Sequence, residues 1–202
     1  MTDLYPLFSQ PVLTVDTDKS KLVDLVSYCE NVLQYRSNAG GNFTSLNTSV
    51  LDLAEFSDAK ELINNAIKVY TQEVMSWTDE GLNFFVTQSW VNKNPRGTWH
   101  HEHYHLNTVL SGVLYLQTVE NDSISFVNNS KPFFKFYPTV SNIWNSERFN
   151  IEAKDNRVVL FPSGMLHGVP SHNSNYNRFS LAFNVFVKGK IGSKENLTYV
   201  EY

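Results

Sequence analysis

The sequence predicts a mainly β protein, a sandwich or jelly roll, with two α-helices near the N-terminus. After residue 82, short runs of β-branched and aromatic residues recur between turn signals, whereas long helical patterns occur only before residue 80. The 4 Trp, 10 Tyr and 14 Phe suit the buried faces of a sheet. The length of 202 residues is enough for one domain and short for two. We therefore expect a single domain over residues 1–202, with the β core in residues 82–190.

The first 80 residues are expected to hold one strand and both helices. Residues 4–15 contain two prolines, which restrict this segment to an edge strand or an extended arm. Apolar residues at helical spacing predict a helix from about Lys19 to Arg36, with N-cap candidates at residues 16–18. A second helix is predicted from about Ala59 to Trp77, capped by residues 57–58. Both helices would pack on the outside of the sheet.

The strands of the β core are predicted from alternating and β-branched patterns. They are expected at residues 82–91, 109–118, 123–127, 157–161 and 178–187. Residues 92–98 are predicted to form a turn or loop because they contain Pro95 and Gly97. The aromatic segment, residues 133–149, is predicted to be irregular. It would form either a lid or wall beside a site or a layer packed against the two helices.

Charge and composition argue against several classes of protein. The net charge of −4 and the absence of a basic cluster make a nucleic-acid partner unlikely. No apolar run is long enough for a transmembrane helix, and the start does not resemble a secretory signal, so we expect a cytoplasmic protein. The single cysteine, Cys29, falls on a helical pattern and is expected to be a buried thiol. An exposed edge strand could support a homodimer, which the sequence leaves open.

The segment Trp99–His105 holds four of the six histidines in the chain. Imidazole is the commonest protein ligand for transition metals. In an extended segment, the side chains of His101, His103 and His105 would share one face. A more distant candidate ligand is His167, which follows a predicted strand and turn. His172 lies in a polar loop and is expected to be solvated.

Arg178 and Ser180 open the last predicted strand and would point to the same face of it. A guanidinium group with a neighbouring hydroxyl can hold a carboxylate through a fork of hydrogen bonds. An arginine on a strand is more often a surface residue. The candidate ligand His167 a short way upstream makes a binding role more specific.

Four motifs therefore follow one another along the chain: His-x-His, Ser111–Leu116, Phe161–Ser163 followed by His167, and Arg178–Asn184. This order resembles the iron(II)- and 2-oxoglutarate-dependent oxygenases. It is most similar to a small stand-alone bacterial and phage group whose chains also begin with a phrase like Leu7–Val12. The resemblance covers most of the chain and is densest from Trp90 to Asn184.

The resemblance implies a cupin-like double-stranded β-helix that binds Fe(II) and 2-oxoglutarate. The implied metal ligands are His103, His105 and His167. The residues implied to bind the cosubstrate are Arg178, on its distal carboxylate, Ser180 and Tyr115 in support, and Asn107 as a weaker candidate near the metal.

One departure from the superfamily pattern concerns position 105. The first ligand pair is usually His-x-Asp or His-x-Glu, whereas this chain has histidine there. A three-histidine site leaves the charge of the metal to be offset by 2-oxoglutarate or another anion, which should alter redox tuning. Two other ligand pairs stay open: His101 with His103, and His100 with Glu102, which would restore His-x-Glu.

The implied activity uses O2 to convert 2-oxoglutarate to succinate and CO2 while a substrate C–H bond is hydroxylated. The substrate would be a protein side chain, such as proline, or a small metabolite. Two alternatives are a cupin-like three-histidine metalloenzyme that does not use 2-oxoglutarate and a non-catalytic jelly-roll binding module. The first leaves Arg178 and Ser180 without a role, and the second gives no reason for the spacing from His167 to Arg178.

Overall fold

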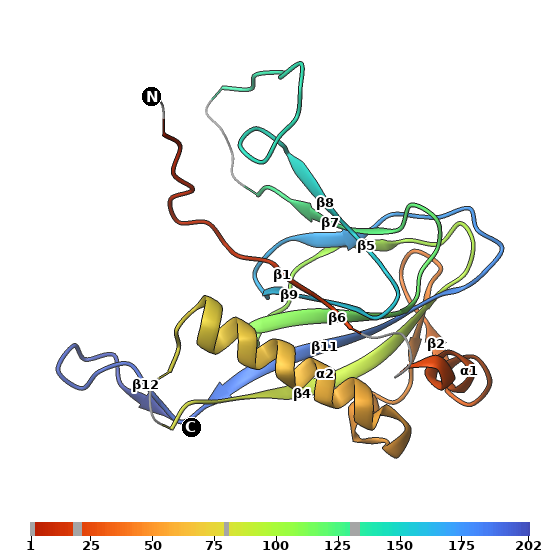
Figure 1. The fold of residues 1–202 in the computed structure, drawn as a ribbon, viewed down its shortest axis with the longest axis horizontal. Helices are drawn as coiled ribbons and strands as arrows, with labels where there is room; N and C mark the ends of the chain where they lie inside the picture. The colour runs from red at the N-terminus through yellow and green to blue at the C-terminus, as the bar shows by residue number, and fades with distance from the viewer. Residues whose placement is uncertain (1–2, 18–21, 79–80, 130–133) are drawn as a thin grey trace.

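The protein, described by a computed structural model over residues 3–17, 22–78, 81–129 and 134–202, is mainly β with two facing sheets and two helices (Figure 1). The strands are β1 (Leu13–Asp16), β2 (Tyr35–Ser37), β3 (Phe43–Ser45), β4 (Asn83–Asn94), β5 (His100–His103), β6 (Leu110–Gln117), β7 (Ser123–Val127), β8 (Arg148–Glu152), β9 (Arg157–Pro162), β10 (His167–Val169), β11 (Arg178–Lys188), β12 (Lys190–Ile191) and β13 (Val200–Glu201). The helices are α1 (Val23–Asn31) and α2 (Ser57–Lys68). Single helical turns occur at Val50–Asp52, Ala54–Phe56 and Val69–Val74.

The larger sheet has seven strands in the order β1-β9-β6-β11-β4-β3-β2, and all its pairings are antiparallel. Its central strand, β11, shows the period of two that a sheet with two different faces requires. Leu181, Phe183 and Val185 belong to the hydrophobic core that includes the helices. Arg178 and Ser180 line a cavity on the opposite face. One strand thus supplies both the core and the cavity.

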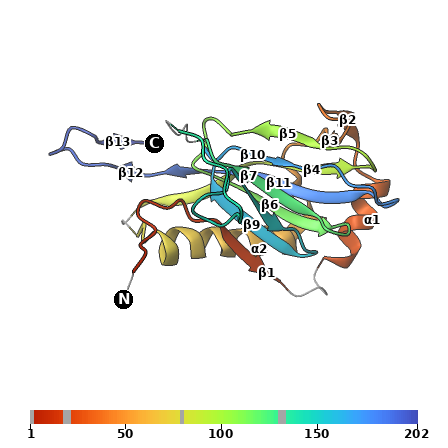
Figure 2. The same ribbon diagram turned by 90° about the horizontal axis from the view of Figure 1, so that it is seen from above.

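The smaller sheet has four strands in the order β5-β10-β7-β8 and covers the cavity face of the larger one (Figure 1). A second apolar cluster lies between the sheets and includes Tyr115 of β6, Ile124 and Phe126 of β7, and Phe161 of β9. The β12–β13 hairpin projects away from both sheets (Figure 2).

Both helices lie against the outer face of the seven-stranded sheet, as predicted (Figure 1). Ile63, Ala66 and Ile67 of α2 are buried against it. Cys29 of α1 is also buried, and burial raises the pKa of its thiol to about 12. The prediction that Cys29 is a buried thiol is confirmed. Among the described residues, no helical segment has the length and apolar character needed to cross a bilayer.

The predicted helix bounds need correction. The first helix does not reach Arg36: it ends at Asn31, and Tyr35–Ser37 instead form β2, which pairs with β3. Its predicted start, residues 19–21, and the cap candidate Asp18 lie outside the described residues. The second helix gives way to a π-helical turn after Lys68. Neither helix has a side-chain N-cap, so the predicted caps at Asp16, Thr17, Ser57 and Asp58 are wrong.

The extended segments also differ in part from the prediction. Of residues 4–15, the described strand includes only the last three. β4 continues to Asn94, through part of the predicted loop, because its end pairs with β11. The aromatic segment does not pack on the helices, since six of its large side chains are exposed and it lies beyond the smaller sheet (Figure 1). These are Phe134, Phe136, Tyr137, Ile143, Trp144 and Phe149. Its first residue, Phe133, lies outside the described residues.

Candidate metal centre

A narrow cavity of about 40 Å³ lies between the two sheets. Residues from both sheets line it, and they include six of the seven predicted site residues. These six are His103, His105, Tyr115, His167, Arg178 and Ser180. The seventh, Asn107, is exposed, has a left-handed backbone conformation with φ of 57°, and is not among the lining residues. The structure therefore gathers residues that are up to 77 positions apart in the sequence, from His103 to Ser180.

Three histidines meet at one end of this cavity. His103 on β5 lies directly opposite His167 on β10 in the antiparallel register. His105 follows β5, and its backbone N–H donates to the carbonyl of Ser163, 2.9 Å away in the turn after β9. The ring centroids are 4.4 Å apart for His103 and His167, 5.0 Å for His103 and His105, and 5.2 Å for His105 and His167. Their candidate ligand atoms all lie within 4.8 Å of one another.

Each of the three rings is held by an oxygen atom at Nδ1. His103 Nδ1 donates to the backbone carbonyl of His101 at 2.8 Å, and His167 Nδ1 donates to that of Met165 at 2.8 Å. His105 Nδ1 donates to the side-chain Oδ1 of Asn184 at 2.5 Å. Because a carbonyl oxygen can only accept, each Nδ1 carries the hydrogen and each Nε2 keeps its lone pair. This is the arrangement that orients histidine ligands in metal sites.

Burial keeps these imidazoles in the form that can bind a metal. It lowers the pKa of His103 and of His105, and it lowers the pKa of His167 to about 3. The neutral ring is the metal ligand, so protons compete little for these nitrogens near pH 7. His105 Nε2 is buried and has no hydrogen-bond partner among the described residues. The donor set therefore suits a divalent transition metal.

The two alternative ligand pairs differ in whether both members belong to a group of candidate metal ligands. Glu102 is exposed and its carboxylate pairs with Arg148; Glu102 and His100 line the same surface pocket, but Glu102 belongs to neither group of candidate ligands. His101 and His103 do lie together, with His100 as a third member of their group. His101 Nδ1, however, is buried without a hydrogen-bond partner among the described residues. The ring of His101 thus lacks the Nδ1 contact that fixes His103, His105 and His167.

Arg178 lies deeper between the sheets and is only 1% exposed. Its Nη1 donates to Oδ1 of Asp122 at 2.8 Å, and both side chains are buried. Ser180 and Tyr115 sit opposite each other on β11 and β6. The hydroxyl of Tyr115 is buried without a hydrogen-bond partner among the described residues, and burial raises its pKa. A guanidinium and two hydroxyl groups therefore lie along the same cavity as the three histidines.

Two residues that contribute to the site were missed in the sequence. Asn184 has a sequence signal: it follows Arg178 by six positions on one strand, so alternation puts both on the same face. Its Oδ1 accepts hydrogen bonds from His105 and from Ser111 Oγ, the latter at 3.0 Å. Asp122 had no signal, because a carboxylate in a polar loop is usually exposed. His172 was predicted to be solvated but is buried, with Nε2 donating to the carbonyl of Asn94 at 2.9 Å.

Comparisons with known proteins agree with this fold. A family model described as "Putative 2OG-Fe(II) oxygenase" matches residues 88–184. No curated protein matches the sequence.

Solved structures of several 2OG-Fe(II) oxygenases and related proteins share the fold. An oxidoreductase of the 2OG-Fe(II) oxygenase family from Burkholderia pseudomallei has a TM-score of 0.61 at 10% identity, covering 87% of this chain and 84% of its own. A Pseudomonas putida prolyl-4-hydroxylase has a TM-score of 0.60 at 14% identity, with 88% and 94% covered. HygX from Streptomyces hygroscopicus, with nickel and 2-oxoglutarate bound, has a TM-score of 0.59 at 11% identity, with 96% and 92% covered.

The family model and the solved structures point to the same class of protein. Residues 88–184 match the model of the 2OG-Fe(II) oxygenases, and the shared fold supports the 2-oxoglutarate- and Fe(II)-dependent oxygenase superfamily.

Proposed function

We propose that this protein is an Fe(II)- and 2-oxoglutarate-dependent dioxygenase with a cupin-like double-stranded β-helix core. It would hydroxylate a protein side chain or a small metabolite. One observation carries the proposal: three histidines from separate positions have converging ligand atoms, and each Nδ1 is held by an oxygen. The Nε2 of His105 is buried and has no hydrogen-bond partner among the described residues, so its lone pair is available to a metal.

The residues that would hold iron are His103, His105 and His167. Neutral imidazole suits ferrous iron, and three protein ligands leave coordination positions for O2 and a keto acid. When bound, the metal and 2-oxoglutarate would supply the oxidising chemistry, in which 2-oxoglutarate becomes succinate and CO2 as a substrate C–H bond is hydroxylated. Because position 105 is histidine, this chain supplies no carboxylate to offset the metal charge. The negative charge that offsets the metal would come from 2-oxoglutarate itself.

The residues that would hold 2-oxoglutarate are Arg178, Ser180 and Tyr115. The guanidinium group of Arg178 would bind the distal carboxylate, and the two hydroxyl groups would donate to it. The unpartnered hydroxyl of Tyr115 supports this assignment. The cavity between the sheets is narrow, with a volume of about 40 Å³.

One observation favours a second candidate, a three-histidine metalloenzyme that does not use 2-oxoglutarate. Asp122 already balances the charge of Arg178 in a buried ion pair. A guanidinium group that is already paired in this way can have a purely structural role, without binding 2-oxoglutarate. The two candidates share the metal ligands and differ in the role of Arg178, so a test of that residue separates them.

The experiment is anaerobic addition of Fe(II) and 2-oxoglutarate, followed by visible absorption. A weak charge-transfer band from the chelated keto acid is expected in the wild type and should be lost in His167→Ala and in Arg178→Ala. The matched controls are His172→Gln and Arg157→Ala, since neither residue lines the cavity, and both should keep the band. No band in the wild type, or a band that persists in Arg178→Ala, would contradict the proposal.

The proposed substrate classes follow the range of the similar structures. HygX was crystallised with hygromycin B, and a prolyl hydroxylase from Trichoplax adhaerens was crystallised with a peptide fragment. The exposed aromatic residues of the segment 134–149 are the proposed substrate contacts, which keeps the lid or wall interpretation. Peptides and metabolites that stimulate succinate release would identify the class.

Three further proposals rest on the sequence. The chain would act as a single domain over residues 1–202, in the cytoplasm, and could form a homodimer through an edge strand. Nucleic acid is not a proposed partner, because the net charge is −4.

A further inference from the structure

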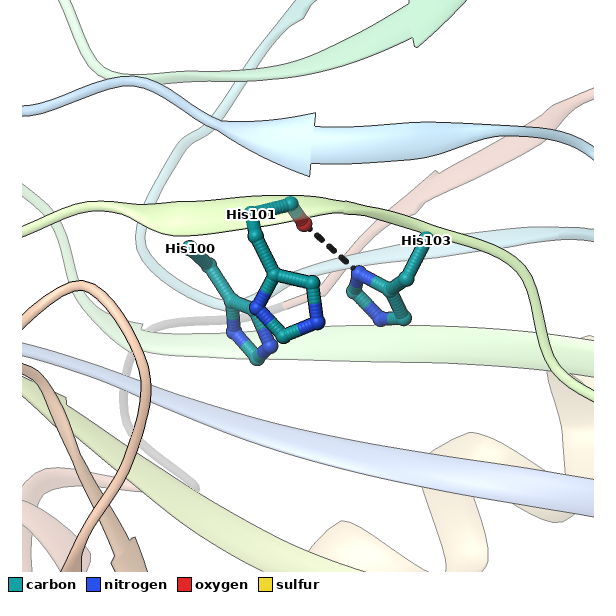
Figure 3. Close-up of side chains that lie close together, drawn as sticks. All are labelled: His100, His101 and His103. Carbon is teal, nitrogen blue, oxygen red and sulfur yellow. Dashed lines mark hydrogen bonds between the residues drawn. The ribbon is translucent and has the colours of Figure 1, made fainter.

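The strand β5 contains a β-bulge beside the candidate metal centre. His103 pairs with His167 and His100 pairs with Val169, so three steps along β5 match two steps along β10. The extra residue disturbs the alternation of side chains. In a regular strand, His100 and His101 would point to opposite faces. Instead their rings lie on the same side as that of His103 (Figure 3).

These three rings form a compact cluster. The centroids are 5.1 Å apart for His100 and His101, 4.7 Å for His100 and His103, and 5.1 Å for His101 and His103. Their candidate ligand atoms lie within 4.8 Å of one another, the same limit that the His103, His105 and His167 group meets. His101 Nδ1 is buried and has no hydrogen-bond partner in the described part of the chain. A buried nitrogen of this kind is costly unless something binds it.

We propose that His100, His101 and His103 form a second binding position for a divalent transition metal, which competes with the first position for His103. Three imidazoles are a typical donor set for Zn²⁺, with water as the fourth ligand. Because His103 Nδ1 donates to the carbonyl of His101, only its Nε2 can bind a metal (Figure 3). One lone pair cannot serve two ions, so the two positions exclude each other.

The consequence for the protein concerns inhibition by other metals. An ion at the second position removes a ligand from the first, which under the proposed function is the iron site. Zn²⁺ binds nitrogen ligands more tightly than Fe²⁺ does. Excess Zn²⁺ would therefore inactivate the protein by holding His103 away from His105 and His167, in addition to direct replacement of iron.

The test uses Zn²⁺ alone, without 2-oxoglutarate, on the full metal-free chain. Isothermal titration calorimetry should give one ion per chain for the wild type. His105→Ala/His167→Ala removes the first position and should still bind one ion. Adding His100→Ala and His101→Ala to that variant should abolish the binding. Two tightly bound ions in the wild type, or equal binding by the double and quadruple variants, would overturn the proposal.

A milder set of variants covers the case in which loss of the buried His167 prevents folding. His105→Gln removes one ligand of the first position only. In this background, His101→Ala should weaken Zn²⁺ binding by at least about tenfold, while in the wild-type background its effect should be smaller. An equal effect in both backgrounds would contradict a second position. Absence of the Fe(II) and 2-oxoglutarate band would leave this result standing, so the two proposals fail separately.

Discussion

The side chain of Asn184 orients the imidazole ring of His105, a candidate metal ligand, through a hydrogen bond at Nδ1. Its Oδ1 accepts the Nδ1 hydrogen of His105 and the hydroxyl hydrogen of Ser111. Carbonyl groups of the backbone play the same part for His103 and His167. Of the three candidate ligands, His105 alone is held by a side chain, and it also occupies the position at which the superfamily pattern has a carboxylate. Its orientation should therefore be the most sensitive to mutation.

Asn184→Ala should lower the affinity of the metal-free protein for Fe(II) by about 10- to 100-fold, because the ring of His105 loses its partner. Asn184→Asp keeps an acceptor and should retain most of the affinity. The matched control is Ser111→Ala, which removes the other hydrogen bond of Asn184 but leaves His105 held. Equilibrium metal competition measures all three. Equal affinity in Asn184→Ala and the wild type would show that His105 needs no support.

At the residue scale, sequence patterns predicted the candidate ligands but not the residues that support them. Histidine clusters are rare enough to stand out, and the order of motifs that resembles the oxygenases linked His103 and His105 to His167. Asp122 is different, because its burial depends on where a loop meets the other sheet. His172 is buried for a similar reason, since it packs against the end of β4. Such long-range contacts leave no local pattern in the sequence.

At the element scale, the strands that were predicted in the core match closely, whereas β8 and β10 were not predicted and the N-terminal segments were predicted less well. β7 matches its predicted bounds, β6 is shorter than predicted by one residue at each end, and β9 and β11 each extend one residue further at the C-terminal end. Strong alternation of buried and cavity-facing residues explains this agreement. The hairpin of β2 and β3 was missed, because Tyr35–Ser37 continue a helical pattern and become strand through pairing with β3. The bulge in β5 likewise depends on its partner strand.

The contact between β6 and β11 gives a prediction about packing. A Cβ atom on Gly112 would lie 2.3 Å from Cζ of Phe183, on the opposite strand. Gly112→Ala should therefore lower the free energy of unfolding by about 1–3 kcal/mol, as overpacking does. Gly164→Ala is the control, because nothing lies within 4 Å of its Cβ position. Urea unfolding that gives the same loss for both variants would contradict this account of the β6–β11 contact.

At the scale of the whole molecule, a buried ion pair joins the two sheets. Arg178 begins β11 of the larger sheet, and Asp122 directly precedes β7 of the smaller one. Both side chains are 2% exposed, so the pair links the two sheets beside the cavity that Arg178 lines. The same contact thus links stability with the proposed cosubstrate site.

Asp122→Ala should lower the free energy of unfolding by about 3–5 kcal/mol, because it leaves the charge of Arg178 buried and unpaired. Replacing both partners, as in Asp122→Leu/Arg178→Met, should recover much of that loss, since a buried ion pair often contributes little over apolar residues of similar size. The control is Asp16→Ala, which breaks the ion pair between Asp16 and Arg157. Because the Asp16 side chain is 59% exposed, this change should lower the free energy of unfolding by at most about 1 kcal/mol. Urea unfolding of the four proteins measures these differences. If the double variant is as unstable as Asp122→Ala, the loss comes from packing at Asp122 and not from an uncompensated charge between the sheets.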